Sequence, residues 1–201
     1  MPLTAIAINC TLKPAPAASS CEKLLGQVAD ALRGLGATCD LVRAVDLPIK
    51  PGVTSDEGPG DAWPELRRRI LAADILILGT PIWLGHPSSV CQRVLERMDA
   101  FLGELDDGGR MAPYGRVAGV AVVGNEDGAH HVSAELFQAL NDVGFTLAAG
   151  AVTYWVGEAM QKTDFQDLPA TPQKTAQATR ELALNCVHLA RLLRDAPYPA
   201  R

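Results

Sequence analysis

The sequence predicts an α/β fold, a three-layer doubly wound five-stranded parallel sheet in the order 2-1-3-4-5. Strand-like and helix-like segments alternate along the 201 residues. Such alternation gives a parallel sheet with helices on both faces, because its crossovers are right-handed. The run Ile75–Leu78 is wholly apolar and ends at Gly79, as expected of a strand buried on both faces. We find no internal repeat or linker and therefore expect a single domain over residues 1–201.

The predicted elements follow in chain order. Strands are expected where short apolar runs lie between loop residues, at Leu3–Asn9, Thr38–Val42, Ala73–Gly79, Arg116–Val123 and Gly150–Val156. Helices are expected where apolar residues recur every three to four positions or where a cap begins them: Cys21–Leu35, Pro64–Ala72, a helix opening at Ser88 or Ser89 and carrying Val90–Leu102, Val132–Val143, and a final helix capped by Thr171-Pro172. Stretches 46–62 and 103–115 are surface excursions, and the first is long enough for a lid or a subunit contact.

Composition excludes several classes of protein. With 48% hydrophobic and 20% charged residues the chain has an ordinary globular composition, and its net charge of -5 argues against nucleic-acid binding. No apolar stretch approaches the roughly 20 residues needed to cross a bilayer, so we expect no membrane partner. The start lacks a basic signal-peptide region, and the five cysteines include no C-x-x-C pair. These features predict a cytoplasmic protein with reduced thiols.

The predicted strand order brings three loops to one edge of the sheet, at the switch point where such folds bind ligands. The loop after the first strand offers Thr11, Lys13, Ser19 and Ser20 as donors beside a helix start, which suits a phosphate. An alternative interpretation is that Ser19-x-x-Glu22 forms only a capping box. The sequence leaves both open.

The other two loops suit a flat aromatic ligand. In Thr80–Ser89, Trp83 is placed to lie against a ring system while backbone groups from Pro81 to Gly85 reach its polar edge, which favours a flavin. Trp83 packed on a neighbouring subunit or over the core is the alternative. Gly124, Asn125, Glu126, Asp127 and Gly128 form the third loop, which is suited to a heterocycle's edge but is also a good turn.

Other site types lack their motifs. The chain has no G-x-G-x-x-G after the first strand, no P-loop and no G-x-S-x-G elbow. His130 and His131 are adjacent, and neighbouring side chains that point different ways rarely share one metal. We therefore expect no metal site and a surface or flavin-edge role for these histidines.

The three loops together resemble the flavodoxin-like NAD(P)H-dependent FMN reductase and quinone reductase family over nearly the whole chain. The segment TPIWLGHPSS looks like that family's T-P-x-[YW]-x-G-x-x-S loop, followed by VCQRVLERMD and later VVGNEDG. The resemblance implies that Thr11, Lys13, Ser19 and Ser20 hold the FMN phosphate. It also implies that Pro81, Ile82, Trp83, Leu84 and Gly85 border one edge of the isoalloxazine, and Gly124, Asn125, Glu126, Asp127 and Gly128 the other.

The implied function is an oxidoreductase that passes hydride from NADH or NADPH through bound FMN to a quinone or similar small-molecule acceptor. No protein acid or base is required in such an enzyme, and Trp83 and His86 would border the open flavin face together with the 46–62 stretch. The resemblance also implies a homodimer or homotetramer. The rival hypotheses are a non-enzymatic flavodoxin-type electron carrier and a doubly wound protein that binds no flavin.

Overall fold

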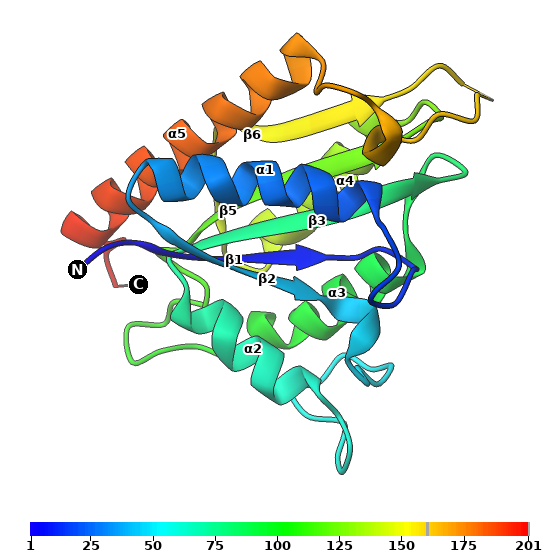
Figure 1. The fold of residues 1–201 in the computed structure, drawn as a ribbon. Coiled ribbons are helices and arrows are strands. Elements are labelled where there is room, and N and C mark those ends of the chain that lie inside the picture. Colours follow the sequence, from blue (N-terminus) through cyan, green and yellow to red (C-terminus); the bar gives the residue numbers. More distant parts are fainter. Residues whose placement is uncertain (160, 201) are drawn as a thin grey trace.

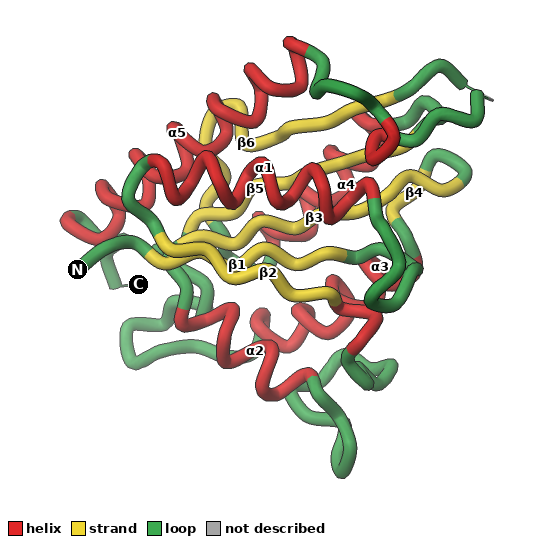
Figure 2. The backbone as a smooth tube through the Cα atoms, in the orientation of Figure 1, coloured by secondary structure: helices red, strands yellow, loops and turns green. Residues whose placement is uncertain are grey.

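The computed structural model describes residues 1–159 and 161–200. Within them, five parallel strands form a sheet in the order β2-β1-β3-β5-β6, and the short strand β4 pairs antiparallel with β3 off this path (Figures 1 and 2). Because β4 is an extra strand that the sequence did not predict, this is the predicted order 2-1-3-4-5. The fold class is confirmed.

The elements have the following bounds. The strands are β1 Thr4–Asn9, β2 Thr38–Arg43, β3 Ile75–Trp83, β4 His86–Pro87, β5 Val117–Gly124 and β6 Thr146–Val156. The helices are α1 Ser20–Gly34, α2 Trp63–Ala72, α3 Ser89–Met98, α4 Ala129–Asp142 and α5 Gln173–Asp195, with short 3-10 turns η1 Ala44–Asp46, η2 Asp99–Leu102 and η3 Phe165–Asp167.

Helices cover both faces of the sheet, as Figure 1 shows. Helices α1 and α5 bury apolar residues in one core, and α2, α3 and α4 bury theirs in the other. Strand β3 contributes Ile75 and Ile77 to the first core and Leu76 and Leu78 to the second. This alternation is that of a strand with two buried faces, which explains its continuous apolar sequence.

Three boundaries differ from the predictions. Strand β3 continues past Gly79 to Trp83 and turns into β4 through Leu84 and Gly85, whose φ values of 52° and 78° suit a two-residue hairpin turn. Strand β6 begins at Thr146 rather than Gly150, because an irregularity in its register opposite β5 lets the pairing continue. Thr171 does not cap α5, since its hydroxyl instead accepts a hydrogen bond from Gln27.

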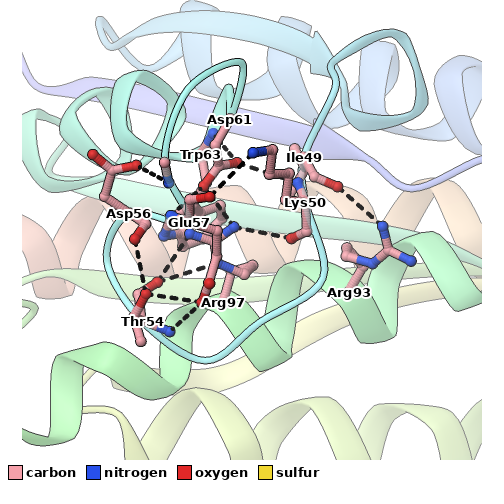
Figure 3. Close-up of polar contacts among 10 residues, drawn as sticks. Ile49, Lys50, Thr54, Asp56, Glu57, Asp61, Trp63, Arg93 and Arg97 are labelled. Carbon is pink, nitrogen blue, oxygen red and sulfur yellow. Dashed lines mark hydrogen bonds and ion pairs between the residues drawn. The ribbon is translucent and has the colours of Figure 1, made fainter.

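The 46–62 stretch is fastened to helix α3 (Figure 3). The guanidinium of Arg97 lies 2.8 Å from the Asp61 carboxylate, and both side chains are fully buried. Arg97 also donates to the carbonyl oxygens of Lys50 and Thr54, at 2.9 Å in each case. These contacts hold much of the stretch against α3, which argues against a lid; the alternative, a subunit contact, stays a prediction.

The Asp61 carboxylate completes this network from within the stretch. It accepts the backbone N–H groups of Lys50, Glu57 and Trp63 at 3.0 to 3.2 Å. Burial by itself raises the pKa of Asp61, but these N–H groups and Arg97 outweigh burial and lower that pKa to about 2. Asp61 is therefore ionised at neutral pH, and its partners are Arg97 and backbone N–H groups of the protein itself.

Candidate functional site

A pocket opens at the carboxyl edge of the sheet, where the chain leaves β1, β3, β5 and β6. Its lining combines hydroxyl groups, one lysine, one carboxylate, aromatic rings and apolar side chains. The residues are Thr11, Leu12, Lys13, Ser19, Ser20, Cys21, Pro81, Ile82, Trp83, Val123, Gly124, Asn125, Trp155, Asp164 and Phe165. The structure thus brings the three predicted loops together at the predicted edge.

The loop between β1 and α1 presents three hydroxyl groups to this pocket. Each hydroxyl oxygen accepts one backbone N–H: Thr11 from Lys13 at 3.3 Å, Ser19 from Glu22 at 3.2 Å, and Ser20 from Gln166 at 3.2 Å. Within residues 1–159 and 161–200, none of the three O–H groups donates a hydrogen bond. Each hydroxyl accepts one hydrogen bond and has its hydrogen unused, so these hydroxyls can donate to a ligand.

More donors lie in the same place. The ammonium group of Lys13 has no hydrogen bond or ion pair among the described residues, and the first N–H groups of α1 have no acceptor within their helix. The side-chain oxygen of Asn9 accepts from the N–H of Thr11 at 3.0 Å, while its Nδ2 atom is buried without a partner in the described part of the chain. A set of donors with so few internal acceptors is suited to an anion.

The capping interpretation of Ser19 also holds. Ser19 is the N-cap of α1, and its side chain accepts from Glu22. The carboxylate of Glu22, however, pairs with Arg43, so the box is only half formed. Capping uses a lone pair of Ser19 and leaves its hydrogen for another partner, so the two interpretations are compatible.

Two residues at and just after the end of β2 hold the β1–α1 loop in place. Arg43 donates to the carbonyl oxygens of Lys13 at 3.1 Å and Ala17 at 2.9 Å, and its side chain is buried. Asp46 accepts the N–H of Ala15 at 3.0 Å. These bonds come from the protein itself, and they hold the backbone of the loop, and with it the donors, in place.

The second and third loops form the wall on the β3 and β5 side. Pro81, Ile82 and Trp83 of the one loop and Gly124 and Asn125 of the other line the pocket, and the side chain of Trp83 is half-exposed. The remaining residues predicted for these edges lie outside the lining: Leu84, Gly85, Glu126, Asp127 and Gly128.

These outer residues nevertheless join the two loops. The N–H of Leu84 donates to Glu126 Oε1 at 3.0 Å. A Cβ atom on Gly128 would lie 3.0 Å from the Cα of Gly85. The glycine at position 128 therefore permits a close approach of two backbones, and the two loops form one continuous rim.

Sequence reasoning missed the contribution of the segment after β6. Trp155, Asp164 and Phe165 line the pocket, and the rings of Trp155 and Phe165 lie 5.5 Å apart. Asn125 Nδ2 donates to Asp164 Oδ1 at 3.3 Å, and Lys23 Nζ donates to three carbonyl oxygens of residues 165–168. One signal was available, because Trp155 sits at the end of a predicted strand just as Trp83 sits beyond another.

The histidines lie outside the pocket lining. His86, predicted to border the open face, lies on β4 with its Nδ1 atom 3.2 Å from Glu135 Oε1. His130 contacts the Tyr154 hydroxyl at 3.2 Å, whereas His131 Nε2 lies 2.7 Å from Glu135 Oε1. The two adjacent histidines point different ways, as predicted, but the structure gives His131 two neighbouring ligand groups that the sequence did not reveal.

Comparison with known proteins identifies a family and several similar proteins. The family described as "NADPH-dependent FMN reductase" matches residues 3–161. The 8-demethyl-8-aminoriboflavin-5'-phosphate synthase of Streptomyces davaonensis is 31% identical over 98% of this chain and 81% of that protein. A crystal structure of RosB with bound 8-demethyl-8-formylriboflavin-5'-phosphate superposes with a TM-score of 0.89 at 30% identity, covering 98% of this chain and 82% of that one.

A protein of Mycobacterium bovis named as the divalent metal cation transporter MntH is 38% identical over 99% of this chain. The chain spans only 30% of the length of that protein. None of the helices in the described residues is long and apolar enough to cross a membrane. The family match covers most of the chain, including the three loops that resemble this family's motifs: the chain belongs to the NADPH-dependent FMN reductase family.

Proposed function

We propose that the pocket binds FMN, with the phosphate held by Thr11, Lys13, Ser19 and Ser20. The observation that carries this proposal is the convergence of hydroxyl, ammonium and helix N–H donors on a pocket that also has aromatic walls. In a phosphorylated flavin, the phosphate suits the donors and the ring system suits the aromatic walls. The RosB structure, with its bound riboflavin-5'-phosphate derivative, supports the same ligand class.

The ring system would lie toward the rim formed by the β3 and β5 loops. Pro81, Ile82 and Trp83 supply the apolar part of this wall, and Gly124 and Asn125 continue it beside them. The hydrogen bond between Leu84 and Glu126 holds the two loops together. In this proposal Leu84, Gly85, Glu126, Asp127 and Gly128 shape the rim from outside.

The reaction we propose is reduction of a quinone or a similar small acceptor with electrons from NADH or NADPH. When bound, FMN supplies the hydride chemistry, and the protein supplies orientation and electrostatics. Trp83, half-exposed at the pocket mouth, is placed to border the face that both substrates visit in turn. Cytoplasmic location and assembly as a homodimer or homotetramer stay predictions.

Rapid mixing separates the enzyme from an electron carrier. The FMN-loaded protein is mixed anaerobically with NADH or NADPH, and the flavin absorbance is followed. In a reductase, NADH or NADPH bleaches the flavin absorbance. Steady-state assays with the same nicotinamide and benzoquinone then give parallel double-reciprocal lines. If neither nicotinamide bleaches the flavin while a one-electron donor does, the protein is a carrier.

A second candidate function is chemical modification of the flavin itself. It is favoured by the 31% identity, over nearly the whole chain, to an enzyme named for making an aminoriboflavin phosphate. Mass spectrometry of FMN incubated with the protein, in air and with an amine donor present, decides this point. A flavin recovered with unchanged mass after many turnovers of nicotinamide supports the reductase, whereas a new flavin mass supports modification.

A further inference from the structure

A compact group of metal-ligand side chains lies outside the pocket lining, between β4 and α4. His86 Nδ1 and His131 Nε2 lie 3.2 Å and 2.7 Å from the same oxygen, Oε1 of Glu135. All three ligand atoms fall within 4.8 Å of one another, and the two imidazole rings meet edge to face at 5.2 Å. Two segments far apart in sequence thus direct three ligand groups at one point.

We propose that His86, His131 and Glu135 bind a divalent transition-metal ion of the Zn²⁺ class. Two imidazoles and one carboxylate are an established zinc ligand set, with water in the fourth position. Zinc bonds of about 2.0–2.2 Å place the ligand atoms of a tetrahedral site about 3.4 Å apart. The two histidine nitrogens lie 3.2 Å and 2.7 Å from the Glu135 oxygen, and all three ligand atoms lie within 4.8 Å of one another, so side-chain shifts without backbone movement would complete the site.

The positions and chemistry of the three side chains also favour a zinc ion. His131 and Glu135 are four residues apart on α4, so they share one helix face. The imidazoles favour zinc over Mg²⁺ or Ca²⁺, which prefer all-oxygen sites. A cation near the first turns of a helix is disfavoured by the helix dipole. The carboxylate of Glu135 lies between the two rings and offsets that effect.

Metal binding at this position has a mechanical consequence. It would join the tip of the β3–β4 hairpin, through His86, to helix α4. The bond between Leu84 and Glu126 links the same hairpin to the loop that precedes α4. The metal would therefore restrain the hairpin that carries Trp83. This inference does not depend on whether FMN occupies the pocket.

Calorimetric titration of the full-length chain with ZnCl₂ tests the site. We expect one equivalent of zinc to bind, with a rise in melting temperature. His86→Ala, His131→Ala and Glu135→Gln should each weaken zinc affinity by at least about tenfold, since loss of even an outer-shell partner costs 10–100-fold. His130→Ala and His188→Ala are the matched controls and should bind zinc as the unmodified chain does.

Hydrogen exchange supplies a second readout. Zinc should slow amide exchange in residues 83–87 and leave residues 161–168 unchanged, and His131→Ala should abolish the difference. Absence of zinc binding at millimolar concentration would overturn the proposal. So would equal zinc affinity in the ligand variants and the controls, because binding would then reside elsewhere, for instance at the buried thiols.

Discussion

Two proline-rich connections of this protein look alike in sequence and differ in their chemistry. One joins β1 to α1 through residues 10–19, and the other joins η1 to α2 through residues 47–62. In the second, Arg97 and Asp61 form the only ion pair among the described residues in which both side chains are fully buried. Arg97 donates to carbonyl groups of the loop, and Asp61 accepts its N–H groups. In the first, the hydroxyl hydrogens of Thr11 and Ser19 and the Lys13 ammonium have no acceptor within residues 1–159 and 161–200.

The comparison teaches that unused donors, rather than loop length or composition, distinguish the connection that we propose to bind the ligand. Folded proteins pair nearly all their buried polar groups. The 47–62 connection follows that rule through Arg97 and Asp61, so it is structural. In the 10–19 connection, the Lys13 ammonium is exposed, and the Thr11 and Ser19 hydroxyls accept hydrogen bonds but donate none within residues 1–159 and 161–200, where they line a pocket. The predictions below separate the two roles.

The largest effect is expected from Arg97→Leu. It leaves the Asp61 charge buried without its partner and two loop carbonyls without a donor, which costs about 3–5 kcal/mol of folding free energy. Denaturant unfolding measures this loss. Arg93→Leu is the control, because Arg93 donates to the Ile49 carbonyl and is only half-buried. FMN affinity of folded Arg97→Leu should stay unchanged, and a large loss would give the 47–62 connection a binding role.

Acid should weaken the same network. The pKa of Asp61 is lowered from 3.8 in the unfolded chain to about 2 in the folded one. A lowered pKa stabilises the folded state above pH 4, and the stabilisation is lost as the pH falls toward 2. Between about pH 5 and pH 2 the loss amounts to about 2 kcal/mol. In Asp61→Asn, the unfolding free energy should lack this part of its pH dependence. The same pH dependence in both proteins would contradict the lowered pKa of Asp61.

On the binding side, Ser20→Asp should weaken FMN affinity by about tenfold or more, or about 1.4 kcal/mol. It sets a negative charge beside the phosphate at the first residue of α1, where an acid is otherwise favourable to the helix. Ser89→Asp is a close control, because Ser89 is likewise the first residue of a helix with a serine N-cap. Fluorescence titration should show a loss in the first variant alone. Equal affinities would favour a purely structural role for Ser20.

The smallest change in stability is expected for Trp83→Ala. Trp83 is 53% exposed, so its removal should alter the unfolding free energy by no more than about 0.5 kcal/mol. Steady-state turnover with a nicotinamide and benzoquinone should nevertheless fall, because Trp83 borders the pocket mouth. Normal turnover with lowered stability would instead identify Trp83 as a packing residue.

Elements that follow from local patterning were predictable, and contacts between distant segments were not. The apolar run Ile75–Leu78 predicted a central strand, and the strand alternation predicted the sheet order. The hairpin at Leu84 and Gly85 was missed because a leucine with positive φ is unusual. Asp164 was missed because its place in the pocket depends on Asn125 and Lys23, which hold residues 161–168 from two other elements.

The most direct test of the account compares FMN with riboflavin, which lacks only the phosphate. Both are titrated into the flavin-free chain, and flavin fluorescence is followed. Charge-assisted hydrogen bonds contribute about 1.5–3 kcal/mol each, so FMN should bind at least about tenfold more tightly than riboflavin. The Ser20→Asp variant should lose most of that preference. Equal affinity of the unmodified chain for the two flavins, or no binding of either, would contradict a phosphate site at the β1–α1 loop.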